Sequence, residues 1–137
     1  MDLDAKIGQL LMAGFRGLVA TPGDRVLRNV EQYRLGSVVL FDYDVPLQNP
    51  VRNIESADQA RALIGVLQEV AVGGLLVAVD QESDQVRRLR EQVDFPKLPS
   101  TQVLGAGEPE EMRRGGAVES ELQLEYSTGR RSQSQAR

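Results

Sequence analysis

The sequence predicts an α/β fold with parallel strands, and three observations support this prediction. Two short apolar runs, at residues 37–41 and 75–79, have the length and the β-branched composition of buried strands. A clear helical pattern that begins at Ser56 lies between them. Strand, loop, helix and strand in this order form a βαβ unit, whose two strands are parallel and whose crossover is right-handed.

Two helices are predicted before the first of these strands. One is expected over residues 4–15, where apolar residues recur with helical spacing and form a face that packs in the core, with Asp2 or Asp4 as its N-terminal cap. After the turn signal "TPGD", the pattern predicts a second helix over residues 26–33, which Gly36 is expected to end. The apolar positions of the first helix are Ile7, Leu10, Leu11 and Gly14.

The first strand runs directly into a long loop with acidic side chains, residues 42–54, which is expected to be solvated. The third helix follows, and Ser56 and Gln59 form the S-x-x-Q pattern of a capping box at its start. Its apolar stripe is expected to face the core. The stripe consists of Ala60, Leu63, Ile64, Leu67 and Val70.

The C-terminal part of the chain is less regular. From Val93 onward, Pro96, Pro99 and Pro109 exclude a long helix. Residues 113–137 are polar and lack a strand pattern, so we expect a disordered tail.

Composition excludes several classes of function. The chain has 137 residues and a net charge of -4, which argues against a nucleic-acid partner. The absence of cysteine excludes disulfides and thiolate metal sites, and the absence of histidine removes the commonest general base and metal ligand. No run is long enough for a membrane helix, so no membrane contact is expected. The acidic first residues do not resemble a signal peptide, so we expect either a cytoplasmic location or a true start that the sequence lacks.

Asp80 is the first candidate binding residue. It follows the second apolar run directly, and Asp42 follows the first, so both acids are expected at the carboxyl edge of the sheet. Ligands bind at that edge in open α/β sheets and in (β/α)8 barrels. Taken without further context, a cap for a helix or turn at the strand end is the favoured role of Asp80.

Five segments of the chain resemble a known family in their order and spacing. They are "KIGQLLMAGFRG" (6–17), "LGSVVLFDYDV" (35–45), "RNIES" (52–56), "LLVAVDQE" (75–82) and "FPKLPSTQVLGA" (95–106). Together they are similar to the start of glycoside hydrolase family 3, in its β-N-acetylhexosaminidase branch. The resemblance implies an incomplete (β/α)8 barrel over residues 1–112, its first βα units, followed by a non-homologous tail at 113–137.

The resemblance also implies a function and one site residue. Enzymes of this branch are retaining glycosidases that hydrolyse terminal β-linked N-acetylglucosamine without a cofactor, and peptidoglycan-derived glycans are the implied substrates. Asp80 matches the aspartate of the family that binds sugar hydroxyls, and Gln81 and Glu82 continue the pattern. The family has Gly-Gly-Arg at the next three positions, where this chain has Ser83, Asp84 and Gln85, which puts the shape of the site in doubt.

The catalytic residues of the family have no counterpart in this chain. The nucleophilic aspartate, the histidine acid/base and further sugar-binding residues lie on later strands of the barrel, and nothing after Met112 matches them. A complete barrel needs about 250 residues. The sequence therefore predicts an N-terminal fragment that is inactive alone.

Two alternatives remain open at this point. In one, the chain is a small α/β domain whose Asp42, Asp80 and Glu82 converge to hold Mg²⁺, as in phosphoryl-transfer domains. In the other, it is a fragment without a function of its own. Glu82 and Arg88 are also candidates for an exposed ion pair at the carboxyl edge.

Overall fold

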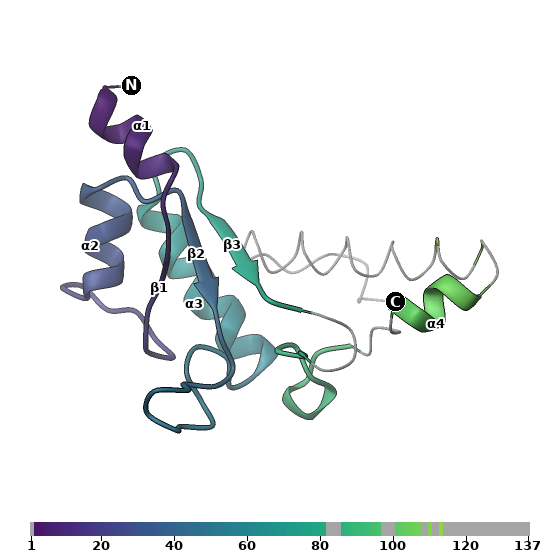
Figure 1. The fold of residues 1–137 in the computed structure, drawn as a ribbon. Coiled ribbons are helices and arrows are strands. Elements are labelled where there is room, and N and C mark those ends of the chain that lie inside the picture. Colours follow the sequence, from purple (N-terminus) through teal and green to yellow (C-terminus); the bar gives the residue numbers. More distant parts are fainter. Residues whose placement is uncertain (1, 82–85, 97–100, 108–109, 111–112, 114–137) are drawn as a thin grey trace, which may run out of the picture.

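The computed structural model describes residues 2–81, 86–96, 101–107, 110 and 113. The described part has an α/β fold, as predicted, with helices packed beside a parallel sheet (Figure 1). Its elements are α1 (Leu3–Gln9), β1 (Met12–Gly14), α2 (Arg25–Gln32), β2 (Ser37–Leu40), α3 (Ala57–Val70), β3 (Leu76–Val79), the 3-10 helix η1 (Glu91–Val93) and α4 (Thr101–Ala106).

The sheet has the strand order β1-β2-β3, and both neighbouring pairs are parallel. In one row of the sheet, Val38 of β2 lies between Ala13 of β1 and Val77 of β3. The predicted βαβ unit is confirmed as β2, α3 and β3. All three carboxyl ends point the same way, and we call the edge formed by Phe15, Phe41 and Asp80, which extend β1, β2 and β3, the rim.

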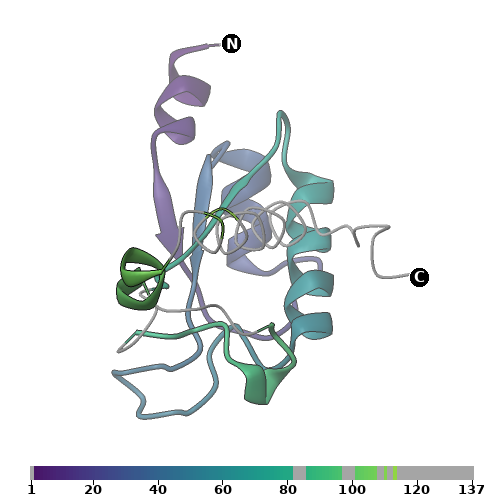
Figure 2. The same cartoon turned by 90° about the vertical axis from the view of Figure 1, so that its right-hand side faces the viewer.

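Helices α2 and α3 cover one face of the sheet (Figure 2). The predicted stripe of α3 is buried except for Val70, which is partly buried, and Ser56 caps the helix by accepting a hydrogen bond from the Gln59 amide at 3.1 Å. The Gln59 side chain binds the Glu55 amide rather than that of Ser56, so only one half of the capping box forms. Buried residues of the two core clusters are Val26, Leu27, Val30, Leu35, Val38, Leu40, Ile54, Ala57, Ala60, Leu63, Ile64, Leu67, Leu75 and Phe95.

The prediction of one helix over residues 4–15 is wrong. α1 ends at Gln9, and residues 12–14 form β1, so the described sheet has three strands where the sequence predicted two. Asp2 does cap α1, by accepting a hydrogen bond from the Ala5 amide at 2.8 Å. The expected core face is also wrong, because Leu10 is 85% exposed. The run "LLMAG" satisfies helical spacing, but pairing with β2 outweighs this local preference.

Gly36 does not end α2, which stops at its C-terminal cap Tyr33. Arg34 takes the left-handed conformation there, with φ at 55°. Gly36 has a different role, because a Cβ atom at this position would lie 2.2 Å from the Gln9 carbonyl oxygen. The absence of a side chain therefore lets the end of α1 pack directly against the start of β2.

Among the described residues, little covers the second face of the sheet. Met12 and Leu76 lie in one row of this face and are 51% and 60% exposed. Parallel sheets are normally covered on both faces. Within the described part of the chain, this open apolar face and the two edge strands without a further neighbour fit the incomplete barrel that the sequence predicted.

The C-terminal part is described only in pieces. Residues 101–106 form the short helix α4, where the sequence analysis predicted irregular structure. The predicted tail at 113–137 lies outside the described residues except for residue 113. No helix within the described ranges is long and apolar enough to cross a membrane.

Candidate functional site at the rim of the sheet

Asp80 lies at the rim, directly after β3, as the sequence predicted. Its side chain is 50% exposed. Its described ion pair is with Arg88, whose Nη2 atom lies 3.8 Å from the Asp80 Oδ2 atom, which is too long for a hydrogen bond. No capping hydrogen bond to its carboxylate is found in the described part of the chain, and the residues directly after it that a cap would bind, 82–85, lie outside that part. The half-exposed carboxylate is accessible to a ligand, with Oδ2 in the ion pair with Arg88.

Arg88 is a site residue that the sequence analysis considered only as a partner of Glu82. Glu82 lies outside the described residues, together with Ser83, Asp84 and Gln85. Arg88 instead donates a hydrogen bond from Nη1 to Asp42 at 3.0 Å. Its backbone amide and that of Leu89 both donate to the Gln81 side chain, at 2.9 and 3.1 Å, which fixes the chain beside Asp80.

The acidic residues of the loop after β2 are not solvated, which corrects the prediction for this loop. Asp42 is 6% exposed and Asp44 is 2% exposed. Asp42 pairs with Arg88 through Oδ1 and with Arg90 through Oδ2, each at 3.0 Å. Burial is possible because each carboxylate is paired with arginine, which compensates the loss of hydration.

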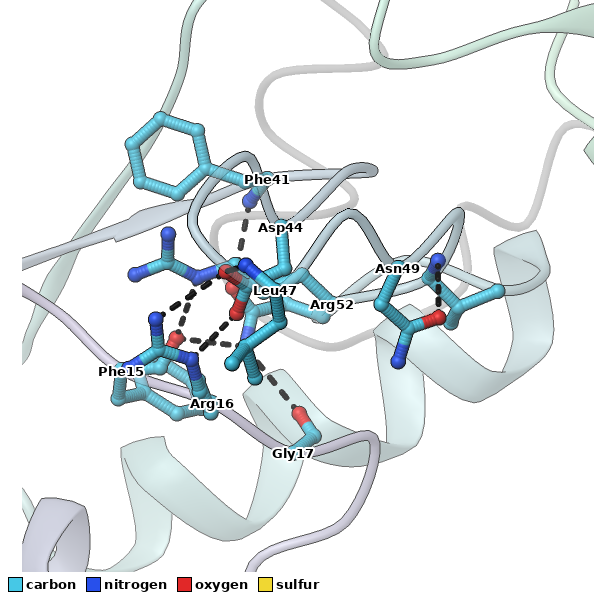
Figure 3. A network of polar contacts seen from close by, with 10 residues as sticks. Phe15, Arg16, Gly17, Phe41, Asp44, Leu47, Asn49 and Arg52 are labelled. Carbon is cyan, nitrogen blue, oxygen red and sulfur yellow. Dashed lines mark hydrogen bonds and ion pairs between the residues drawn. The ribbon is translucent and has the colours of Figure 1, made fainter.

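Asp44 holds the loop in place (Figure 3). It accepts hydrogen bonds from Arg16 Nε and, at 3.1 Å, from Arg16 Nη2, and a third from the Leu47 amide at 3.3 Å. The hydrogen bond from Arg16 lowers the pKa of Asp44 below its usual value, and the same pair raises the pKa of Arg16. The two backbone hydrogen bonds between Asp44 and Asn49 close the loop at its base.

Asn53, which is fully buried, joins the carboxyl ends of β1 and β2. Its side-chain amide donates to the carbonyls of Phe15 and Gly17, each at 3.2 Å, and its side-chain oxygen accepts from the Phe41 amide at 3.3 Å. The neighbouring Arg52 donates to the Phe15 carbonyl at 2.9 Å, and its guanidinium lies 4.6 Å from the centre of the Phe41 ring (Figure 3). Arg52 and Asn53 thus connect the ends of β1 and β2 at the rim.

The alternative of a magnesium site finds no support in the described residues. No group of three carboxylate, histidine or cysteine side chains among them is arranged to hold a metal ion. Both oxygens of Asp42 already bind arginines, and the guanidinium of Arg88 lies between Asp42 and Asp80. Two carboxylates that share an arginine are not preorganised to bind a cation.

Comparison with known proteins identifies relatives of this sequence and fold. A protein named beta-hexosaminidase from Alkalilimnicola ehrlichii is 36% identical over 96 residues, which is 70% of this chain and 24% of that protein. A beta-hexosaminidase from Nitrosomonas eutropha is 34% identical over 69% of this chain and 24% of its own length. A solved glycoside hydrolase family 3 beta-N-acetylglucosaminidase from Paenibacillus sp. str. FPU-7 superposes with a TM-score of 0.75 and 27% identity over 92% of this chain and 22% of that chain. No family model matches the sequence.

The chain spans about a quarter of the length of the curated relatives that it matches. The similarity in sequence agrees with the similarity in fold, because both point to the same group of proteins. The resemblance predicted from the sequence is therefore confirmed: the chain is a fragment of the N-terminal, barrel-type domain of glycoside hydrolase family 3.

Proposed function

We propose that this chain forms the first part of the barrel of a retaining β-N-acetylglucosaminidase of glycoside hydrolase family 3 and carries part of its sugar-binding site. The observation that carries this proposal is Asp80, which stands half-exposed on the rim with both carboxylate oxygens free of hydrogen bonds in the described structure. The relatives named beta-hexosaminidase support the class of substrate.

The chemistry of Asp80 suits a sugar ligand. An ionised carboxylate accepts charge-assisted hydrogen bonds from two neighbouring hydroxyl groups, which fixes the orientation of the sugar ring. Arg88 adds a guanidinium beside this carboxylate, and its side chain is 26% exposed. Together they offer an acceptor and a donor to adjacent hydroxyl groups.

The isolated chain binds the sugar but does not cleave it. Chemistry in a retaining glycosidase needs a nucleophile and an acid/base placed on both sides of the glycosidic bond. The family supplies them from later strands, and this sequence contains no histidine. Two finer points belong to the same proposal: the natural glycan derives from peptidoglycan, and the protein acts in the cytoplasm.

The proposal is tested by titrating the ¹⁵N-labelled chain with N-acetylglucosamine and following backbone amide signals. We expect the signals of residues 79–81 and 88 to move, with a Kd in the millimolar range or weaker, because a Kd of about 1 mM corresponds to about -4 kcal/mol and few contacts are available. Asp80→Asn keeps the shape of the side chain but removes its charge, and it should abolish these shifts.

Glu69→Gln is the matched control, because it removes one carboxylate from the exposed end of α3, far from the rim. It should bind like the original chain. Sugar-induced shifts that persist in Asp80→Asn, or that never occur at the rim, would refute the proposed site.

A further inference from the structure

We propose that Asp42 is a positioning residue that orients the guanidinium of Arg88 toward Asp80. The inference rests on the proposed function, because it takes Asp80 and Arg88 as a sugar-binding pair. It adds Asp42, which binds Arg88 and sets its orientation without itself contacting the sugar.

The contacts of Asp42 carry the first step. Asp42 is buried, and each of its oxygens binds a different arginine, Arg88 through Oδ1 and Arg90 through Oδ2, at 3.0 Å. The Arg88 contact is a charge-assisted hydrogen bond, which is among the stronger polar contacts in proteins, and the Arg90 contact is an ion pair. A buried carboxylate with these partners has little freedom to move.

The described structure offers no comparable second anchor for the guanidinium of Arg88. Its Nε atom is buried and has no hydrogen-bond partner there. Its Nη2 atom lies 3.8 Å from Asp80, and the Phe41 ring centre lies 6.0 Å from its Cζ atom, at the outer limit of a cation–π contact. The hydrogen bond to Asp42 therefore sets the direction of the guanidinium.

The backbone of Arg88 is held by hydrogen bonds that do not involve Asp42. The Gln81 side chain accepts hydrogen bonds from the amides of Arg88 and Leu89. Loss of the Asp42 carboxylate should therefore release the end of the Arg88 side chain while its main chain stays in place. This separation allows the orienting role to be measured apart from the fold.

Orientation matters because a guanidinium is a planar group with donors in fixed directions. With Nη1 bound to Asp42, Nη2 faces Asp80. A hydroxyl group that donates to Asp80 can then accept from Arg88, and both contacts are prepared before the sugar arrives. A freely rotating Arg88 would lose part of this preorganisation.

The experiment follows the side-chain Nε–Hε signal of Arg88 by ¹⁵N NMR relaxation in the absence of sugar. We expect an ordered side chain in the original protein and fast motion in Asp42→Asn. Arg90→Gln is the matched control, because it removes the other partner of Asp42 and leaves the Arg88 contact intact. Arg88 should remain ordered in that variant.

Asp42→Glu guards against a failure of Asp42→Asn to fold. It retains the charge that both arginines need and shifts the carboxylate by one methylene group, so the Arg88 Nε–Hε signal should move while the fold persists. An Arg88 side chain that stays equally ordered in Asp42→Asn, or an unmoved signal in Asp42→Glu, would overturn the inference.

Titration with N-acetylglucosamine then separates the inference from the function on which it rests. We expect at least a tenfold weaker affinity in Asp42→Asn and an unchanged affinity in Arg90→Gln. Release of Arg88 in Asp42→Asn, with no sugar binding by the original protein, would support the orienting contact and refute the proposed function. Unchanged sugar affinity in Asp42→Asn would refute the positioning role.

Discussion

Replacement of Asn53 by leucine should destabilise the fold strongly, although the two side chains are similar in size. The change removes two donated hydrogen bonds and one accepted bond at a fully buried position. The Phe15 carbonyl retains its bond from Arg52, but the Gly17 carbonyl and the Phe41 amide lose their side-chain partner. Each buried polar group left unpaired costs about 1–3 kcal/mol, and because Gly17 and Phe41 are only partly buried, the expected loss lies in the lower part of about 2–6 kcal/mol.

Urea unfolding followed by circular dichroism measures this loss. A small domain has about 5–15 kcal/mol of unfolding free energy in total, so the midpoint should fall clearly with an unchanged slope. Asn49→Leu is the control, because Asn49 is exposed and the Val51 amide, which donates to its side chain, can form a hydrogen bond with water instead. If Asn53→Leu unfolds within about 0.5 kcal/mol of the original chain, the reasoning from unpaired buried groups is refuted.

Three further outcomes are expected. Gly36→Ala should disrupt the packing of α1 and lower the melting temperature, because its Cβ atom would lie 2.2 Å from the Gln9 carbonyl oxygen. Gly65→Ala in α3 places a Cβ atom with no other atom within 4 Å and should raise the melting temperature. Differential scanning calorimetry measures both changes. Because the pKa of Asp44 is lowered in the folded state by its hydrogen bond from Arg16, the pair stabilises the fold above the unfolded pKa of about 3.9 and loses this effect as the pH falls through the lower folded value. The free energy of unfolding, measured from neutral to acidic pH, should fall less steeply in Asp44→Asn than in the original chain. The same pH dependence in both proteins would count against this role of Asp44. A chromogenic N-acetylglucosaminide should not be hydrolysed by the purified chain, and turnover that depends on Asp80 would contradict its assignment as an inactive fragment.

The central part of the fold could be predicted from the sequence because its signals are local. The two β-branched runs and the apolar stripe of α3 are long enough to show their periods, and parallel pairing follows from their order. β1 could not be found in this way. It has three residues, its sequence also fits a helical pattern, and only the neighbouring β2 decides between the two structures.

The site was predictable in position but not in its contacts. Asp80 was placed correctly because a residue after a parallel strand must lie at the rim. The burial of Asp42 depends on arginines at positions 88 and 90, which are far away in the sequence and meet it only because β2 and β3 are neighbours. Pairing of this kind leaves no local pattern, so the acidic loop was wrongly predicted to be solvated.

The most direct test of the account is a crystal structure of the chain soaked with N-acetylglucosamine. The account predicts that two sugar hydroxyl oxygens lie about 2.6–2.8 Å from the two carboxylate oxygens of Asp80, with Arg88 still bound to Asp42. A sugar bound elsewhere, with the rim empty and Asp80 in contact with Arg88 alone, would contradict the claim that this part of the barrel carries a sugar-binding site.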